Sequence, residues 1–259
     1  MTQTSAQLNR FELYEQAAQS PDAQARFLRE IIREAPSTEP TLGEDFCGTG
    51  AISRAWLELD PSHRAVCVDH DAAPLDYLRA RISDPDRVVI HETDVRRAQD
   101  PVDVIAVLNF SICEFHDRRE LVQYLTHARS RLREGGALAL DLYGGVDAYT
   151  LGDSDLELRD DVRYVWEQRE ANPLSGRVVN AMHFERADGA SIRDAFIYNW
   201  RLWSIPEMQD ALLDAGFSSI DLYDSLADAM DDDGRAYIAP IESPDELDDN
   251  YVLTLVATR

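Results

Sequence analysis

The chain has 259 residues, 44% of them hydrophobic, and carries 49 acidic against 25 basic side chains, for a net charge of −24. That hydrophobic content is enough for a substantial core, which excludes a globally disordered chain. Every basic residue is an arginine. Mechanisms that need a lysine are therefore excluded, and nucleic acid is disfavoured as a partner because its phosphates would be repelled.

The sequence shows no sign of a membrane segment or of a metal site. Its first residues are polar, unlike a signal peptide, and no run approaches the ~18 apolar residues of a membrane span. Cys47, Cys67 and Cys113 stand in apolar stretches, and the chain has no Cys-x-x-Cys or His-x-x-x-His pair. We therefore expect buried, reduced thiols, no metal site and a cytoplasmic location.

Helices are expected to open the chain, in an N-terminal helical segment covering residues 1–35. The first spans about residues 8–18, and the second begins at Pro21, behind Ser20 as a favourable N-cap. Apolar strands then alternate with amphipathic helices, and we expect strands at 41–45, 65–68, 88–90, 102–108 and 137–142. Nearly continuous apolar strands separated by helices predict a parallel sheet covered on both faces.

The periodicity then changes, because apolar residues recur at every second position. This predicts antiparallel strands at 162–169, 177–186 and 191–203, in an insertion covering residues 155–203. Ser204 and Glu207 next form a capping box that begins a helix ending at Gly216, and the last strands are expected at 220–223 and 251–257. Segments 36–150 and 204–259 are together predicted to form an α/β domain with a doubly wound, mostly parallel seven-stranded sheet.

Ligands of open parallel sheets bind at the carboxyl ends of the strands, so the residues that follow each strand are the candidate site. After the first strand, Gly48 and Gly50 allow a tight turn and a close approach of backbone to ligand. Asp69 ends the second strand nineteen residues after Gly50, near the spacing at which an acid accepts hydrogen bonds from a ribose. Asp94 and Asn109 follow the next two strands.

Several motifs, in the same order, resemble those of the class I S-adenosylmethionine-dependent methyltransferases, and the opening helices and the insertion resemble their small-molecule branch. Residues 44–50 are similar to motif I, residues 66–69 to the second-strand motif and residues 92–95 to the adenine-contacting segment. Residues 133–136 and 215–217 are similar to later motifs. The resemblance covers about residues 40–145 and 204–259, and it implies a Rossmann-like fold with S-adenosylmethionine as cofactor.

The resemblance also implies roles for the matching residues. Asp69 would hold the ribose hydroxyls, Asp94 would bind the adenine amino group, and Asn109 would lie beneath the sulfonium and its methyl group. The register favours Glu44 over Asp45 as the acid of motif I. Phe46 departs from the family pattern, which has a glycine there. Glu44 and the Cys47 and Gly48 backbone would face the methionine part. The other expected cofactor contacts are Tyr14, Gly50, His70 and Val95.

The implied reaction is methyl transfer to a small-molecule acceptor whose identity the sequence leaves open. An amine acceptor must lose a proton, and the candidate bases are His183, Tyr198 and His116. The insertion is expected to be a substrate lid, with the interface of a homodimer as the alternative use of its aromatic residues. Two other functions remain open: a nicotinamide-dependent oxidoreductase, and a non-catalytic S-adenosylmethionine-binding regulatory subunit.

Overall fold

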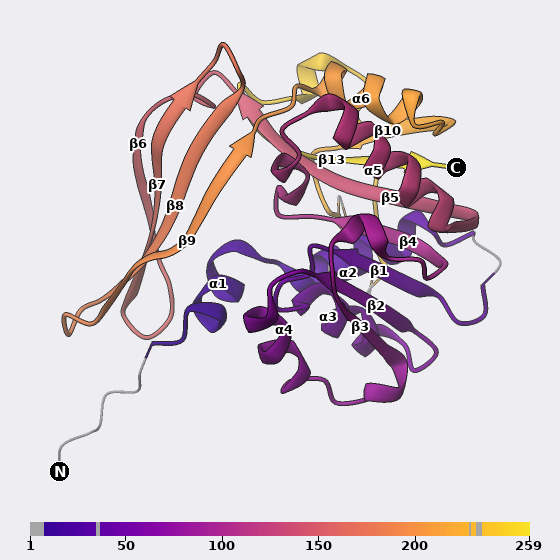
Figure 1. The fold of residues 1–259 in the computed structure, drawn as a ribbon, viewed down its shortest axis with the longest axis horizontal. Coiled ribbons are helices and arrows are strands. Elements are labelled where there is room, and N and C mark those ends of the chain that lie inside the picture. The colour runs from indigo at the N-terminus through magenta and orange to yellow at the C-terminus, as the bar shows by residue number, and fades with distance from the viewer. Residues whose placement is uncertain (1–7, 35–36, 228, 232–234) are drawn as a thin grey trace. The chain divides into compact units, whose positions relative to one another are not determined.

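The computed structural model describes residues 8–34, 37–227, 229–231 and 235–259 (Figure 1). The chain divides into two compact units. The smaller unit contains Met1–Gln19 and Tyr149–Arg201, and the larger unit contains Ser20–Ala148 and Leu202–Arg259. The two opening helices, which the sequence placed in one segment, belong to different units: α1 (Arg10–Ala18) to the smaller and α2 (Pro21–Ile31) to the larger.

The larger unit is built on a seven-stranded sheet with the order β10-β13-β5-β4-β1-β2-β3, which confirms the predicted fold class. The strands β1 to β5 pair in parallel, whereas β13 is antiparallel to both β5 and β10. Their bounds are β1 Thr41–Asp45, β2 Arg64–Asp69, β3 Val88–Glu92, β4 Val102–Val107, β5 Leu132–Gly145, β10 Ser219–Tyr223 and β13 Asn250–Thr258.

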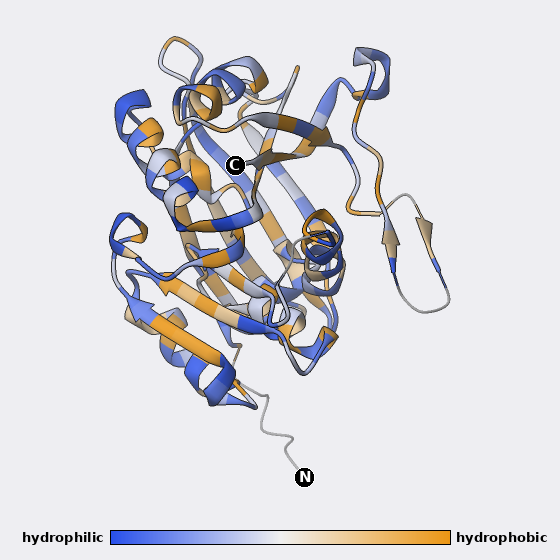
Figure 2. Ribbon diagram, turned by 90° about the vertical axis from the view of Figure 1, so that its right-hand side faces the viewer, coloured by the Kyte–Doolittle hydropathy of each residue, from blue (hydrophilic) through white to orange (hydrophobic). Residues whose placement is uncertain are grey.

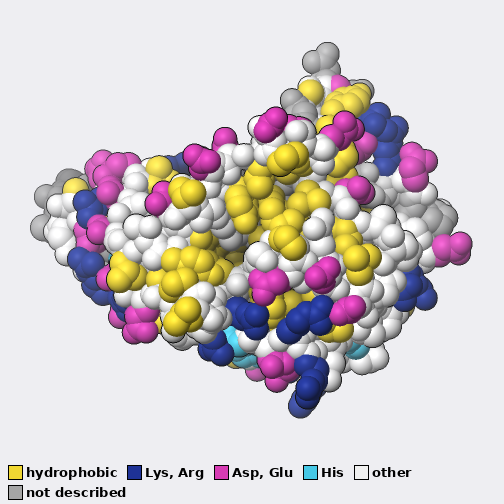
Figure 3. Space-filling view, turned by 90° about the horizontal axis from the view of Figure 1, so that it is seen from above, with side chains coloured by type: hydrophobic (Ala, Val, Ile, Leu, Met, Phe, Trp, Pro, Cys, Tyr) yellow, Lys and Arg dark blue, Asp and Glu magenta, His cyan; other side chains and the backbone are white. Residues whose placement is uncertain are grey.

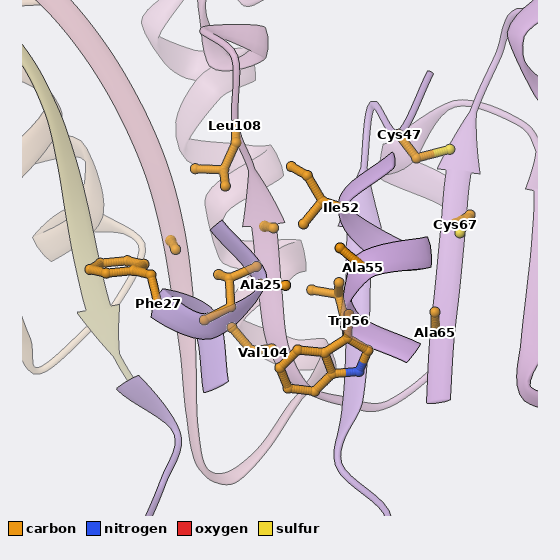
Figure 4. Close-up of a cluster of buried hydrophobic side chains, with 14 of the residues drawn as sticks. Ala25, Phe27, Cys47, Ile52, Ala55, Trp56, Ala65, Cys67, Val104 and Leu108 are labelled. Carbon is orange, nitrogen blue, oxygen red and sulfur yellow. The ribbon is translucent and has the colours of Figure 1, made fainter. Parts of the chain in front are cut away.

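Helices cover both faces of this sheet. Successive residues of a strand point to opposite faces, and in β1 the side chain of Glu44 reaches α3 (Ala51–Leu59) whereas that of Asp45 reaches α5 (Arg118–Arg131). On the α3 face, α2, α3 and α4 (Ala72–Arg79) contribute to a core cluster that includes Leu78. Phe27 and Trp56 of this cluster are shown in Figure 4. The strands of the sheet are largely hydrophobic, as the orange segments of Figure 2 show.

The C-terminal part of the larger unit begins with α6 (Ile205–Asp214). Ser204 and Glu207 form the predicted capping box at its start.

The larger unit also contains short elements. They are the strands β11 Ala229–Met230 and β12 Ala236–Tyr237 and the 3-10 helices η1 Pro85–Arg87, η2 Val95–Arg97, η3 Ser111–Glu114 and η4 Pro244–Glu246. Among the residues that the structure describes, no helix is long and apolar enough to cross a membrane.

The smaller unit is a four-stranded antiparallel sheet with α1 packed on it. The strands run in sequence order as β6 Gly152–Glu157, β7 Val162–Asn172, β8 Arg177–Arg186 and β9 Ser191–Arg201. The sequence predicted three of them and missed β6, whose six residues are all exposed and therefore show no alternation. Leu13 of α1 belongs to the core of this unit with Val162, Met182 and Phe184.

Candidate functional site

The glycine loop after β1 and the acid at the end of β2 are joined by a hydrogen bond. The Gly48 N–H donates to Oδ2 of Asp69 at 2.8 Å, and the Asp71 N–H donates to Oδ1 at 2.9 Å. The loop is also tied to β2 by the Cys47 N–H, which donates to the Val68 carbonyl at 3.0 Å. Each oxygen of the Asp69 carboxylate has thus accepted one N–H bond and keeps further acceptor capacity. The His70 ring beside it is exposed.

The two loop glycines serve different purposes. A Cβ atom added at Gly48 would find no heavy atom within 4 Å, so the space over this residue is open. A Cβ atom at Gly50 would lie 2.6 Å from Cδ1 of Leu78, so Gly50 is needed for the packing of the loop against α4. Both glycines have positive φ angles, 51° at Gly48 and 62° at Gly50, which other residues rarely adopt.

Phe46 occupies the position where the family pattern has glycine, and it takes the conformation that glycine favours, with φ of 59°. A non-glycine residue in this region costs about 1 to 3 kcal/mol. The Phe46 ring packs edge-on against Phe115 at 5.9 Å and Tyr124 at 6.2 Å between centroids. These aromatic contacts help to offset the strain.

The two acids of β1 have separate roles. Oε2 of Glu44 accepts bonds from the Ser53 N–H at 2.9 Å and the Ser53 hydroxyl at 2.5 Å, so Glu44 caps the first turn of α3. Burial raises the pKa of Glu44 to about 7, although these two bonds lower it. Asp45 instead forms a buried ion pair with Arg131 at 2.8 Å and accepts a hydrogen bond from the Tyr124 hydroxyl. Asp45 is therefore committed to the core, on the face away from α3.

Asp94 begins η2 after β3. Its carboxylate accepts a hydrogen bond from the Arg96 N–H at 2.9 Å and pairs with the Arg96 guanidinium at 2.5 Å. The hydrogen bonds and charge of Arg96 lower the pKa of Asp94 to about 2, so this carboxylate stays ionised at neutral pH. The next residue, Val95, is buried.

The turn after β4 is held by a buried carboxylate that the sequence reading missed. Asn109 and Phe110 both have positive φ angles, 58° and 62°. Their N–H groups donate to the two oxygens of Asp141 in β5, at 2.8 and 2.6 Å. Burial raises the pKa of Asp141 to about 7, against the lowering effect of these two bonds. An aspartate in the otherwise apolar stretch 137–142 was the available sequence signal.

Polar atoms without partners mark the same end of the sheet. Oγ1 of Thr49 and Oε1 of Gln24 are buried and have no hydrogen-bond partner within the described part of the chain. The Gln24 amide nitrogen approaches Oδ1 of Asn109 at 3.4 Å, which brings α2 to the turn after β4. Buried polar atoms are normally satisfied. These two unsatisfied oxygens lie at the same end of the sheet as the open loop at Gly48 and the Asp69 carboxylate, which can still accept hydrogen bonds. The set fits a polar ligand such as a nucleoside carrying an amino acid.

Comparisons with known proteins agree with this geometry. Residues 46–136 match the sequence model of a methyltransferase domain. An S-adenosylmethionine-dependent methyltransferase from Clostridium acetobutylicum superposes with a TM-score of 0.73 at 17% identity, covering 96% of each chain. An amino pentose methyltransferase from Micromonospora echinaspora, with S-adenosylmethionine bound, gives 0.69 at 17% identity and 100% coverage of both chains. A sugar N-methyltransferase from Streptoalloteichus gives 0.67 at 18% identity, covering 100% of this chain and 96% of that one. No curated protein matches.

Residues 46–136 therefore match a methyltransferase domain, and the chain has the fold of S-adenosylmethionine-dependent methyltransferases. At 17–18% identity, the similar structures show the fold alone. The type of domain is indicated by the sequence match at residues 46–136. In this fold Asp69 ends β2, whereas Asp94 and Asn109 follow β3 and β4. Among the described residues, no group of three or more histidine, cysteine or carboxylate side chains is arranged to hold a metal ion.

Of the three candidate bases, His183 has partners at both ring nitrogens. The Asp194 N–H donates to its Nδ1 at 2.9 Å, so the ring proton lies on Nε2, which is 3.0 Å from Oε2 of Glu167. Because both ring nitrogens are used and the ring is buried, this arrangement favours a structural role. Tyr198 lies on the opposite face of the small sheet, where its hydroxyl donates to Sδ of Met182 at 3.3 Å.

Two further candidates are His116, the third candidate base, and Tyr14, an expected cofactor contact. His116 directly precedes Asp117, which is the actual N-cap of α5, so His116 does not cap that helix. Tyr14 packs its ring against Phe196 within the smaller unit, at 5.1 Å between centroids. The roles of His116 and Tyr14 at the site, and the role of the small sheet as a substrate lid, stay predictions.

Proposed function

We propose that the protein transfers the methyl group of S-adenosylmethionine to an amine of a small polar molecule, with amino sugars as the first class to test. Support for the cofactor comes from the methyltransferase domain at residues 46–136. Support for the acceptor comes from similar structures, which include a sugar N-methyltransferase and an amino pentose methyltransferase. The observation that carries the proposal is the hydrogen bond from the Gly48 N–H to the Asp69 carboxylate, together with the open space over Gly48.

The proposed cofactor site follows the carboxyl ends of the strands. Asp69 would accept hydrogen bonds from the two ribose hydroxyls, for which its remaining lone pairs suffice. The backbone of Cys47 and Gly48, with open space over Gly48, would face the methionine part, and Asp94 would face the adenine. Asn109, held in its strained conformation by Asp141, would lie at the transferred methyl group. Glu44 would act through α3, because its carboxylate is held by Ser53.

The chemistry asks little of the protein beyond placement. S-adenosylmethionine supplies an electrophilic methyl group, and the acceptor nitrogen forms its new bond to carbon as the bond to sulfur breaks. The chain must align the acceptor with that bond and keep water out, since positioning is the largest contribution available to such an in-line displacement. The acceptor amine must also arrive without its extra proton or lose it at the site.

The first experiment is calorimetric titration with S-adenosylmethionine, with its demethylated product and with NAD. We expect the first two to bind and NAD not to bind. Asp69→Ala should weaken binding about ten- to a hundredfold, because hydrogen bonds to a charged acceptor are worth about 1.5–3 kcal/mol. The control is Asp76→Ala, which removes an exposed carboxylate from α4. Equal affinity in folded Asp69→Ala protein would remove Asp69 from the site.

The second experiment is turnover. Purified protein and S-adenosylmethionine are incubated with a panel of amino sugars, their hydroxyl analogues and other small amines, and products are identified by mass spectrometry. Methylation of amino sugars but not of the hydroxyl analogues supports the proposed acceptor. Tight cofactor binding with no product from any acceptor would instead favour the regulatory alternative.

A further inference from the structure

A cavity of about 370 Å³ lies in the larger unit at the end of the sheet opposite to the candidate cofactor site. Its wall includes Pro40 and His63, which directly precede β1 and β2. The candidate cofactor residues instead follow the carboxyl ends of these strands. Since β2 has six residues and a strand rises about 3.3 Å per residue, the two sites are about 16 Å apart.

The wall of this cavity is basic although the chain is strongly acidic. Four arginines line it: Arg26 and Arg29 from α2, Arg33 from the turn after α2, and Arg235 from the segment before β12. Among the residues that the structure describes, the acids in the wall are Glu30 and Asp60. The whole chain has 49 acidic against 25 basic side chains, so this wall reverses the overall ratio. Such a reversal on a concave surface attracts anions.

Ion pairs with Glu30 hold two of these arginines in place without cancelling their charge. One carboxylate, that of Glu30, holds two guanidinium groups: Arg235 at 2.9 Å and Arg33 at 3.5 Å. Their exposed fractions are 35% for Arg235 and 45% for Arg33, so both still present donors to solvent. Arginine has five N–H donors, and pairing with one carboxylate leaves several unused.

The positive charge of the wall comes from arginine alone. Nδ1 of His63 lies 2.9 Å from the Trp56 carbonyl, which can only accept, so Nδ1 carries the ring proton. Burial lowers the pKa of His63, which favours the neutral form of its ring. The hydroxyls of Ser37 and Thr38 add uncharged donors to the wall.

We propose that this cavity binds a phosphate group, as the free ion or as a small phosphorylated metabolite. Guanidinium groups match the oxygens of phosphate with paired, directed hydrogen bonds. Arginines that approach from α2 and from the distant segment before β12 suit a tetrahedral anion better than a planar carboxylate. The site is separate from methyl transfer, and it stands whether or not the proposed acceptor is correct.

The test is titration of the full chain with inorganic phosphate, pyrophosphate and ribose 5-phosphate, followed by calorimetry and by the shift in melting temperature. We expect dissociation constants of about 1 mM or tighter for at least one probe. Stronger binding of ribose 5-phosphate than of inorganic phosphate identifies a phosphorylated metabolite as the ligand class, and the reverse order identifies the free ion. No binding by any of the three probes would overturn the proposal.

Variants separate a built site from general attraction. Arg29→Gln and Arg235→Gln should each weaken binding of the tightest-binding probe at least about tenfold. Arg29→Lys keeps the charge but loses the paired donors of the guanidinium group, so it should weaken binding less. The control is Arg79→Gln, which removes an equal charge from an exposed ion pair on α4. Affinity for S-adenosylmethionine should not change in any of them. Equal weakening by Arg79→Gln would show that the probes respond only to net charge.

Discussion

Asp141 and Glu44 are carboxyls whose environment opposes their ionisation. Each is buried, and each holds backbone that the candidate site depends on: the turn at Asn109 and Phe110 for one, the start of α3 for the other. Burial raises the pKa of both to about 7, from the ordinary values of 3.8 for Asp141 and 4.5 for Glu44. Holding this backbone with buried carboxyls therefore lowers the free energy of unfolding by an amount that depends on pH.

This cost predicts that the protein loses stability as the pH rises from about 4 to about 7. Across that range the unfolded chain has released the two protons and the folded chain still holds them. The unfolded state therefore binds fewer protons, so the free energy of unfolding falls as pH rises and levels off above the folded pKa values. The loss is on the order of a few kcal/mol, and urea unfolding at a series of pH values measures it.

The control for this prediction is Asp141→Asn, which cannot titrate and leaves every other charge unchanged. Its free energy of unfolding should fall less steeply with pH than that of the parent. It should also lower turnover more than cofactor affinity, because the amide nitrogen of Asn would face one of the two N–H groups at the turn. Parallel pH curves for parent and variant would show that Asp141 titrates normally.

At the scale of elements, β1 is tied to α5 by the buried pair of Asp45 and Arg131. The two side chains have exposed fractions of 0% and 2%. Removing one member of a buried pair leaves the other charge unpaired in the core, which typically costs about 3–5 kcal/mol. We therefore expect Asp45→Ala to lower the free energy of unfolding by that amount, as measured by urea denaturation. Asp76→Ala, which breaks an exposed pair with Arg79, should cost less than about 1 kcal/mol.

The same elements show how far the sequence could lead. The parallel strands and the acid at Asp69 were predictable because their signals are local: apolar runs, glycines and a short spacing. The strand β6 was missed because it is exposed along its whole length and is a strand only through its pairing with β7. Asp45 pairs with a residue 86 positions away, and Asp141 holds N–H groups 31 and 32 positions away. No local pattern reveals such partners.

The whole molecule is dominated by its charge of −24. Acidic side chains are spread over the face shown in Figure 3, among arginines and exposed apolar groups. Like charges at this density repel one another and favour expansion of the chain. In the arginine-lined cavity the ratio of acids to bases is reversed. The acidity itself points to solubility or to a salty surrounding rather than to a cationic partner.

Salt should therefore stabilise the protein at pH 7. Added NaCl shortens the Debye length to about 3 Å at 1 M and screens the repulsion, so the melting temperature should rise with salt up to that concentration. The matched control is the same series near pH 4.4, the isoelectric point of the sequence, where little net charge remains to be screened and the curve should be nearly flat. A melting temperature that is flat or falls with salt at pH 7 contradicts the prediction. An equal rise at both pH values would assign the effect to salting-out of apolar surface instead.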